Sequence, residues 1–181
     1  MPRKPQHPEC LFRRLSYQGR KFGFEVATLR LPNGVEGELE TIRHPGGAMA
    51  VPVAADGRFV LVRQYRFPVG EWLLEFPAGT VEAGEAPEGT IRRELEEETG
   101  FRAHHWDFLG DFPLAPGYSD ELIHAYLARE LEPLDDPPAQ DDDEDLETVL
   151  LTGAELMAAV RAGEADAKTL GGYLLVRDRL G

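Results

Sequence analysis

Residues 79–101 constrain this 181-residue chain more than any other stretch of its sequence. They place Glu94, Glu97 and Glu98 near the end of one predicted helix, behind a glycine-rich turn that also carries Glu85. Like charges at helical neighbour spacing are unfavourable unless something neutralises them. Hard divalent cations prefer carboxylate oxygens as ligands, so the cluster predicts a site for Mg²⁺ or Mn²⁺.

The helix period predicts how these side chains are arranged. Each residue advances about 100° around an α-helix, so Glu94 shares one face with Glu97 and Glu98. Ile91 and Leu95 form an apolar pair four residues apart that points away from that face. We therefore expect the helix to dock on a sheet through the apolar pair while its carboxylates face a cleft.

The spacing of the acidic residues also matches a known motif. It runs Gly79, five residues, Glu85, seven residues, Arg93-Glu94-Leu95, one residue, Glu97-Glu98, one residue, Gly100-Phe101. This is the full Nudix box, and the chain resembles the Nudix hydrolases, which cut a nucleoside diphosphate linked to another group. The alternative is a surface helix with a solvated acidic face, which would not require this fixed spacing.

The resemblance implies an α/β fold, the Nudix-type α/β/α sandwich with a mixed sheet. It implies a metal site for Mg²⁺, with Mn²⁺ as the alternative. The implied ligands are Glu94, Glu97, Glu98 and the backbone carbonyl of Ala78. Gly79, Glu85 and Arg93 are expected to support the site, with an Arg93–Glu85 ion pair joining loop to helix; direct ligation by Glu85 is the alternative.

Residues outside the box resemble the ADP-ribose pyrophosphatase branch of that family. Pro116 lies fifteen residues beyond Phe101, and Tyr118 follows as a candidate to stack on adenine. Arg63 and Arg66 come after an apolar strand, and the resemblance implies that they bind substrate. The alternatives are an ordinary Pro-Gly turn at Pro116 and ion pairs between the two arginines and surface acids.

A general base is expected in the acidic segment 130–147, which contains ten acids and three prolines and is predicted to be an exposed loop. By resemblance Glu144 takes this role, acting with Glu97 and Glu98 of the box. The neighbouring acids blur the register, and Glu147 is the next choice. The alternative is that Glu97 itself supplies the base.

The rest of the sequence predicts two parts, a strand unit at 1–47 and a catalytic domain at 48–181. The first residues are expected to be poorly ordered, and 11–42 to form a small antiparallel unit. Segments 49–54 and 59–63 predict a hairpin, and strands are also expected at 72–76, 106–112, 123–128 and 148–151. Helices are expected between Pro87 and Gly100, from Thr152 to near Gly163, and at 167–180.

Composition limits the environment and the partners. A net charge of −14 argues against a general nucleic-acid binder. The sequence has no apolar run of membrane-spanning length and no signal peptide at its start. The single cysteine, Cys10, cannot form an intrachain disulfide and suits a cytoplasmic protein. Family resemblance implies a homodimer formed through the N-terminal strands.

Together these features predict metal-dependent hydrolysis of ADP-ribose, a nucleotide-sugar, to AMP and ribose 5-phosphate. Hydrolysis of another nucleotide-sugar, such as GDP-mannose, or of NADH is the alternative. A more remote alternative is a sensor that binds ADP-ribose without cutting it. The complete set of box acids and the lack of a basic helix-turn-helix pattern argue against a sensor.

Overall fold

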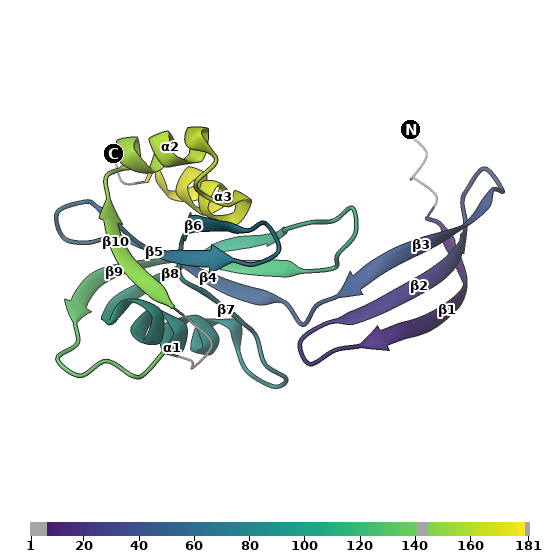
Figure 1. The fold of residues 1–181 in the computed structure, drawn as a ribbon, viewed down its shortest axis with the longest axis horizontal. Helices are drawn as coiled ribbons and strands as arrows, with labels where there is room; N and C mark the ends of the chain where they lie inside the picture. Colours follow the sequence, from purple (N-terminus) through teal and green to yellow (C-terminus); the bar gives the residue numbers. More distant parts are fainter. Residues whose placement is uncertain (1–6, 141–144, 180–181) are drawn as a thin grey trace. The chain divides into compact units, whose positions relative to one another are not determined.

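The computed structural model describes residues 7–140 and 145–179. The chain divides into two compact units, both traced in Figure 1. The N-terminal unit runs to Pro45 and includes the segment Ala115–Glu121. The larger unit contains Gly46–Leu114 and the chain from Leu122 onward.

The N-terminal unit is an antiparallel sheet in the order β1-β2-β3. Its strands are β1 (Glu9–Gln18), β2 (Gly23–Arg30) and β3 (Glu36–Arg43). At the β2–β3 turn the Leu31 N–H donates to the Val35 carbonyl at 2.8 Å, and Gly34 takes a φ of 84° that favours glycine. This confirms the predicted antiparallel strand unit.

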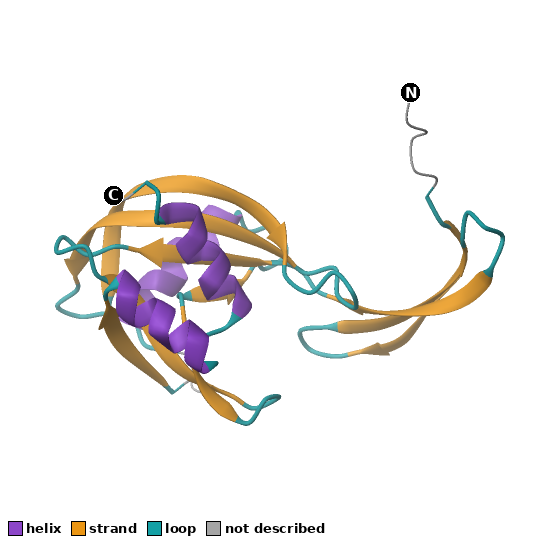
Figure 2. Ribbon diagram, turned by 90° about the horizontal axis from the view of Figure 1, so that it is seen from above, coloured by secondary structure: helices purple, strands orange, loops and turns teal. Residues whose placement is uncertain are grey.

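The larger unit holds two sheets between helices. Its strands are β4 (Gly47–Pro52), β5 (Phe59–Arg66), β6 (Glu71–Glu75), β7 (Ala78–Thr80), β8 (Phe101–Pro113), β9 (Leu122–Pro133) and β10 (Leu146–Leu151). The orders are β7-β4-β9-β8, with a parallel β4–β9 pair, and β10-β5-β6, which is antiparallel. Helix α1 (Pro87–Thr99) lies on one side, and α2 (Gly153–Ala162) and α3 (Ala167–Val176) lie together on the other (Figures 1 and 2). The α/β/α arrangement with a mixed sheet is confirmed.

Strand β4 shows how the sequence builds these layers. All six of its residues are buried, and successive side chains point to opposite faces. Met49 and Val51 belong to the core that contains residues of α2 and α3. Ala48 and Ala50 belong to a second core with Ile91 and Leu95 of α1. The apolar pair on α1 therefore docks the helix as its spacing predicts, and small alanines line the face beneath it.

The predicted hairpin at 49–63 is wrong. β4 and β5 lie in different sheets and share only the isolated bridge Val53↔Phe59, next to a turn in which the Ala54 N–H donates to the Arg58 carbonyl. β4 is apolar on both faces and sits between β7 and β9, whereas β5 sits between β6 and β10. Two strands flanked on both edges by other strands cannot also pair with each other.

Several predicted element ends also differ. Strands β9 and β10 extend into the acidic segment, so 130–133 and 146–147 are strand and not loop. α3 ends at Val176, earlier than expected. The ends with local signals agree: α2 begins at a complete Thr152–Glu155 capping box, and α1 ends at Gly100 with a φ of 72°.

Within the described residues, no helix is both long enough and apolar enough to cross a membrane.

Candidate active site

The box carboxylates line one face of α1 at its C-terminal half. The side chains of Glu94 and Glu97 are 15% and 26% exposed, and Glu98 is buried. On the neighbouring face, about a quarter turn around the helix, Ile91 and Leu95 are fully buried against the sheet. The acids are therefore held on a rigid helix whose rotation is fixed by the apolar contact.

Strand β7 is pinned against this acidic face at two places. The Ala78 N–H donates to Glu98 Oε2 at 3.0 Å. Gly79 lies directly against the Glu94 side chain, and a Cβ built on Gly79 would overlap the Glu94 carboxyl group. The glycine leaves room for the Glu94 carboxyl group, which any larger residue at this position would force to move. The backbone of Ala78 is thereby fixed beside the acids. Its carbonyl oxygen is the expected metal ligand.

Arg93 lies among the carboxylates and partly neutralises them. It lies 2.9 Å from Glu94, 2.7 Å from Glu97 and 3.8 Å from Glu85. Partial burial acts to lower the pKa of Arg93, but Glu94, Glu97 and Glu85 together raise it above its usual value. The expected pair with Glu85 is thus the longest of three contacts. Three carboxylates contact one guanidinium, which leaves a net negative charge on the cluster.

The donor set fits a hard cation in its chemistry. It consists of carboxylate oxygens and a carbonyl oxygen, which Mg²⁺ and Mn²⁺ prefer. In the part of the chain that the structure describes, no group of three His, Cys, Asp or Glu side chains converges closely enough to hold a metal ion. Arg93 instead bridges Glu94 and Glu97. Arg93 and a cation would therefore draw on the same two carboxylates.

Arg66 is paired with a carboxylate that the sequence did not single out. Its Nε donates to Glu75 Oε1 and its Nη2 donates to Glu75 Oε2, both at 2.6 Å. Glu75 is 2% exposed. Lys168 Nζ also donates to Glu75. Burial would raise the pKa of Glu75, but the Arg66 hydrogen bond and the two positive charges outweigh it and lower the pKa to about 2. The sequence signal that could have found Glu75 is an acidic residue at the end of an apolar strand, four residues before the first glycine of the Nudix box.

Arg63 has a weaker partner. Its Nε lies 3.4 Å from Glu147 Oε2 across the β5–β10 pair, and both side chains are about half exposed or more. Exposed pairs of this kind contribute little to stability. Arg63 therefore pairs with a surface acid, as the alternative from the sequence has it, whereas Arg66 pairs with a buried one.

Comparison with known proteins identifies the family. The model of the NUDIX domain matches residues 43–170. The chain is 37% identical to the ADP-ribose pyrophosphatase of Bacillus subtilis (strain 168) over 84% of this chain and 83% of that protein. It is 36% identical to the methanol dehydrogenase activator of Bacillus methanolicus over 85% and 84% of the two chains. The chain belongs to the Nudix hydrolase family.

The fold gives the same result. A crystal structure of an ADP compounds hydrolase superposes with a TM-score of 0.84 and 27% sequence identity. It covers 98% of this chain and 96% of that one. The likeness thus extends well beyond the Nudix box.

The predicted base Glu144 lies outside the described residues. Both flanks of its segment contact the C-terminal end of the Nudix helix α1. The Leu134 N–H donates to the Gly100 carbonyl at 2.9 Å, and Thr148 Oγ1 lies 3.5 Å from the Thr99 carbonyl. The chain on either side of the acidic stretch is thus anchored next to Glu98.

Pro116 and Tyr118 belong to the N-terminal unit through the segment Ala115–Glu121. The Ile42 N–H donates to the Tyr118 carbonyl at 2.8 Å, and Arg43 pairs with Asp120 at 2.7 Å. The Tyr118 side chain is 63% exposed. The segment is thus tied to β3, and the predicted contact of Pro116 and Tyr118 with substrate stays a prediction.

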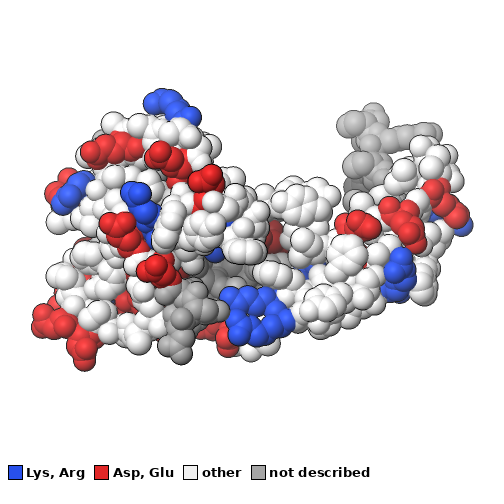
Figure 3. All heavy atoms as spheres, viewed as in Figure 1, with Lys and Arg blue, Asp and Glu red and all other residues white. Residues whose placement is uncertain are grey.

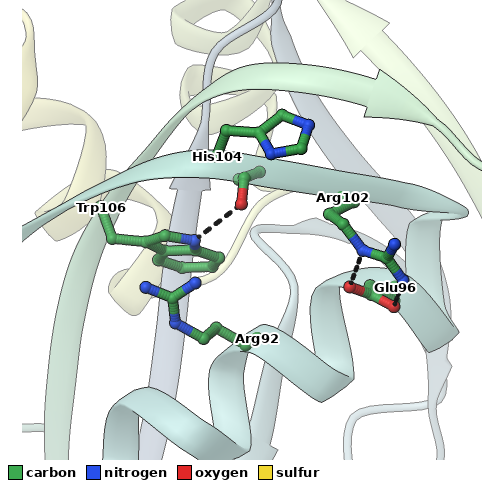
Figure 4. A pocket seen from close by; sticks show the side chains of 6 residues that line it. Arg92, Glu96, Arg102, His104 and Trp106 are labelled. Carbon is green, nitrogen blue, oxygen red and sulfur yellow. Dashed lines mark hydrogen bonds and ion pairs between the residues drawn. The ribbon is translucent and has the colours of Figure 1, made fainter.

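One hollow lies beside α1, on the face opposite the box carboxylates. It is lined by Arg92, Glu96, Arg102, Ala103, His104 and Trp106 (Figure 4). Residues 92 and 96 point roughly opposite to 94 and 98 on the helix wheel. Arg102 binds both oxygens of Glu96 at 2.7 and 2.8 Å, and the Arg92 guanidinium lies 5.0 Å from the Trp106 ring centroid. These charged groups have partners and lie on the opposite side of α1 from Glu94 and Glu98, so we assign them no role in the Nudix site.

Proposed function

We propose that the protein hydrolyses the pyrophosphate bond of ADP-ribose to AMP and ribose 5-phosphate with a divalent metal ion, Mg²⁺ or alternatively Mn²⁺. The observation that carries this is the acidic cluster at α1, where three carboxylates of the Nudix box meet a single guanidinium and a fourth, Glu98, holds the Ala78 backbone. The names of the similar ADP-ribose pyrophosphatase and ADP compounds hydrolase support the choice of substrate.

Glu94, Glu97, Glu98 and the carbonyl of Ala78 would hold the metal. When bound, it would neutralise the diphosphate and make a water molecule more acidic. The protein itself orients the substrate and moves the proton. Arg66 would bind a phosphate oxygen, and Glu144 would accept the proton of the attacking water, with Glu97 as the alternative base.

An anionic substrate must approach a chain of net charge −14. On the face shown in Figure 3, acidic side chains are spread among basic and neutral ones. A cation at the box reverses the sign locally, which makes a small diphosphate a better partner than a nucleic acid. We place the enzyme in the cytoplasm, consistent with its single cysteine, which is exposed and free.

The N-terminal sheet supports a homodimer. Strand β1 is exposed along its whole length and carries Phe12, Leu15 and Tyr17, each more than half exposed. Apolar patches of this kind mark interaction surfaces. We assign residues 1–47 to dimerisation and 48–181 to catalysis, with Arg63, Arg66, Pro116 and Tyr118 as the substrate-binding residues.

A substrate panel tests the function. The purified protein is incubated with ADP-ribose, GDP-mannose or NADH, with Mg²⁺ or with EDTA, and the products are separated. We expect AMP and ribose 5-phosphate from ADP-ribose only with the metal. Equal rates with GDP-mannose would remove the adenine preference, and binding of ADP-ribose without any turnover would instead favour a sensor.

A further inference from the structure

A buried ion-pair cluster joins the start of α3 to the strand that precedes the Nudix box. Glu75 accepts hydrogen bonds from Arg66 and from Lys168, and Lys168 Nζ also lies 2.6 Å from Asp166 Oδ2. The side chains of Lys168 and Glu75 are 7% and 2% exposed. Two cations and two carboxylates make the cluster formally neutral, which is the condition for keeping such charges buried.

The cluster uses only one edge of the Arg66 guanidinium. Nε and Nη2 donate to the two oxygens of Glu75. Across the described residues, Nη1 has no protein acceptor, and the Arg66 side chain is 42% exposed. The pKa of Arg66 is raised chiefly by its hydrogen bond to Glu75, and the charge of Glu98 contributes to the increase. Arg66 therefore offers a free edge to solvent within electrostatic reach of the box.

Lys168 and Arg66 share one oxygen of Glu75. Arg66 Nη2 and Lys168 Nζ both donate to Oε2, while Arg66 Nε donates to Oε1. Without Lys168, a carboxylate that is 2% exposed would keep a single cationic partner, and burial would favour its protonation or its rotation. Either change would break the two-point contact that fixes the guanidinium plane.

The position of Lys168 is itself fixed by the backbone around it. The Leu74 N–H donates to the Glu164 carbonyl at 2.7 Å, and the Phe76 N–H donates to Thr169 Oγ1 at 2.9 Å. These bonds anchor the residues on both sides of Glu75 to the start of α3. Asp166 caps the helix by accepting from the Thr169 N–H at 2.9 Å. Lys168 is thus delivered to Glu75 from a preorganised helix end.

We propose that Lys168 is a positioning residue for Arg66. It holds the Glu75 carboxylate so that the free edge of the guanidinium is presented to a phosphate oxygen of a nucleoside diphosphate. The proposal rests on the proposed function, because it takes such a diphosphate as the ligand. It makes α3, far along the chain from Arg66, part of the substrate-binding apparatus.

The test compares Lys168→Met with Lys168→Arg, which keeps the charge, and with Thr169→Val, which loosens the same helix end without touching Glu75. The first measurement is solvent exchange of the Arg66 Nε–H by ¹⁵N NMR, without any ligand. The second is the dissociation constant of ADP-ribose in EDTA by calorimetry. We expect Lys168→Met to speed the exchange and to weaken binding about 10- to 100-fold, the effect of losing a charge-assisted hydrogen bond. Lys168→Arg should stay near the wild type. Thr169→Val, which loses one backbone anchor but keeps the ion pair, should lose less than Lys168→Met.

A double mutant tests whether Lys168 acts through Arg66. Arg66→Ala combined with Lys168→Met should bind ADP-ribose no more weakly than Arg66→Ala alone. Additive losses, an unchanged Arg66 exchange rate, or an equal loss in Thr169→Val would each overturn the proposal. If the wild type binds no ADP-ribose while the exchange responds as expected, the proposed function fails and the positioning role stands. Should Lys168→Met not fold, Asp166→Asn removes the second anchor of Lys168, and an unchanged exchange rate there would also overturn it.

Discussion

Glu98 Oε2 accepts a hydrogen bond of 3.0 Å from the backbone N–H of Ala78, a residue twenty positions earlier in the chain. This bond joins the end of the Nudix helix to the strand whose carbonyl is the expected metal ligand. Glu98, which we propose as a metal ligand, therefore also fixes the strand beside it. One of its oxygens, Oε2, accepts this backbone hydrogen bond.

Replacing Glu97 or Glu98 by glutamine should reduce turnover of ADP-ribose by at least about 10³-fold, because the negative charge needed to hold the metal is lost. The fold should persist, since a glutamine oxygen at position 98 can still accept the Ala78 N–H. Glu96→Gln is the matched control, because Glu96 lies on the opposite side of α1 and binds Arg102. Steady-state rates with Mg²⁺ test this, and wild-type rates in both box variants would remove the metal assignment.

Gly79→Ala should impair metal binding, because its Cβ would overlap the Glu94 carboxyl group. We expect a loss of about 1–3 kcal/mol in the free energy of unfolding, typical of overpacking. Gly89→Ala on α1, the helix that carries Glu94, is the control. A Cβ there meets nothing within 4 Å, and the change should stabilise the helix by about 0.5–1 kcal/mol. Denaturant unfolding and Mg²⁺ titration calorimetry measure both, and equal behaviour of the two variants would contradict the close-contact argument.

Glu144→Gln should cause a pH-sensitive fall in turnover that is smaller than the effect of the box variants. Glu147→Gln should have little effect, because Glu147 makes only an exposed cross-strand pair with Arg63. The pH–rate profiles of the two variants decide between them. A larger loss in Glu147→Gln would move the general base three residues along the chain.

The stability of the protein should fall in acid partly through Glu75. Its pKa is lowered in the folded state from 4.5 to about 2, so the folded state binds this proton less readily than the unfolded state. The stabilisation is therefore present above about pH 4.5 and is lost as the pH falls toward 2. Unfolding free energies from pH 6 to pH 2.5 should decline less steeply in Glu75→Gln than in the wild type. Parallel curves would show that Glu75 does not carry this dependence.

Light scattering should show a dimer, and replacing Phe12 and Tyr17 together by aspartate should give a monomer, because two exposed apolar side chains of β1 become charged. Lys21→Ala, in the turn after β1, is the control and should remain dimeric. A monomeric wild type at micromolar concentration would exclude the assignment of the N-terminal sheet to dimerisation.

Local signals in the sequence predicted the box helix closely. Its start at Pro87 and its end at Gly100 follow from proline at the first turn and glycine in the left-handed region. The failed hairpin at 49–63 shows the limit of such signals. An apolar run that is buried on both faces does not reveal its neighbours, and β4 and β5 found theirs in different sheets.

The sequence by itself determined the chemistry, because the fixed spacing of acids on a 3.6-residue helix places Glu94, Glu97 and Glu98 on one face whatever surrounds it. Only the tertiary structure decided which groups hold those residues in place. The partner of Arg66 is a buried glutamate nine residues on, and that glutamate is in turn held by Lys168, ninety-three residues further along the chain. Such pairs depend on how sheets and helices pack, and no local period or motif records them.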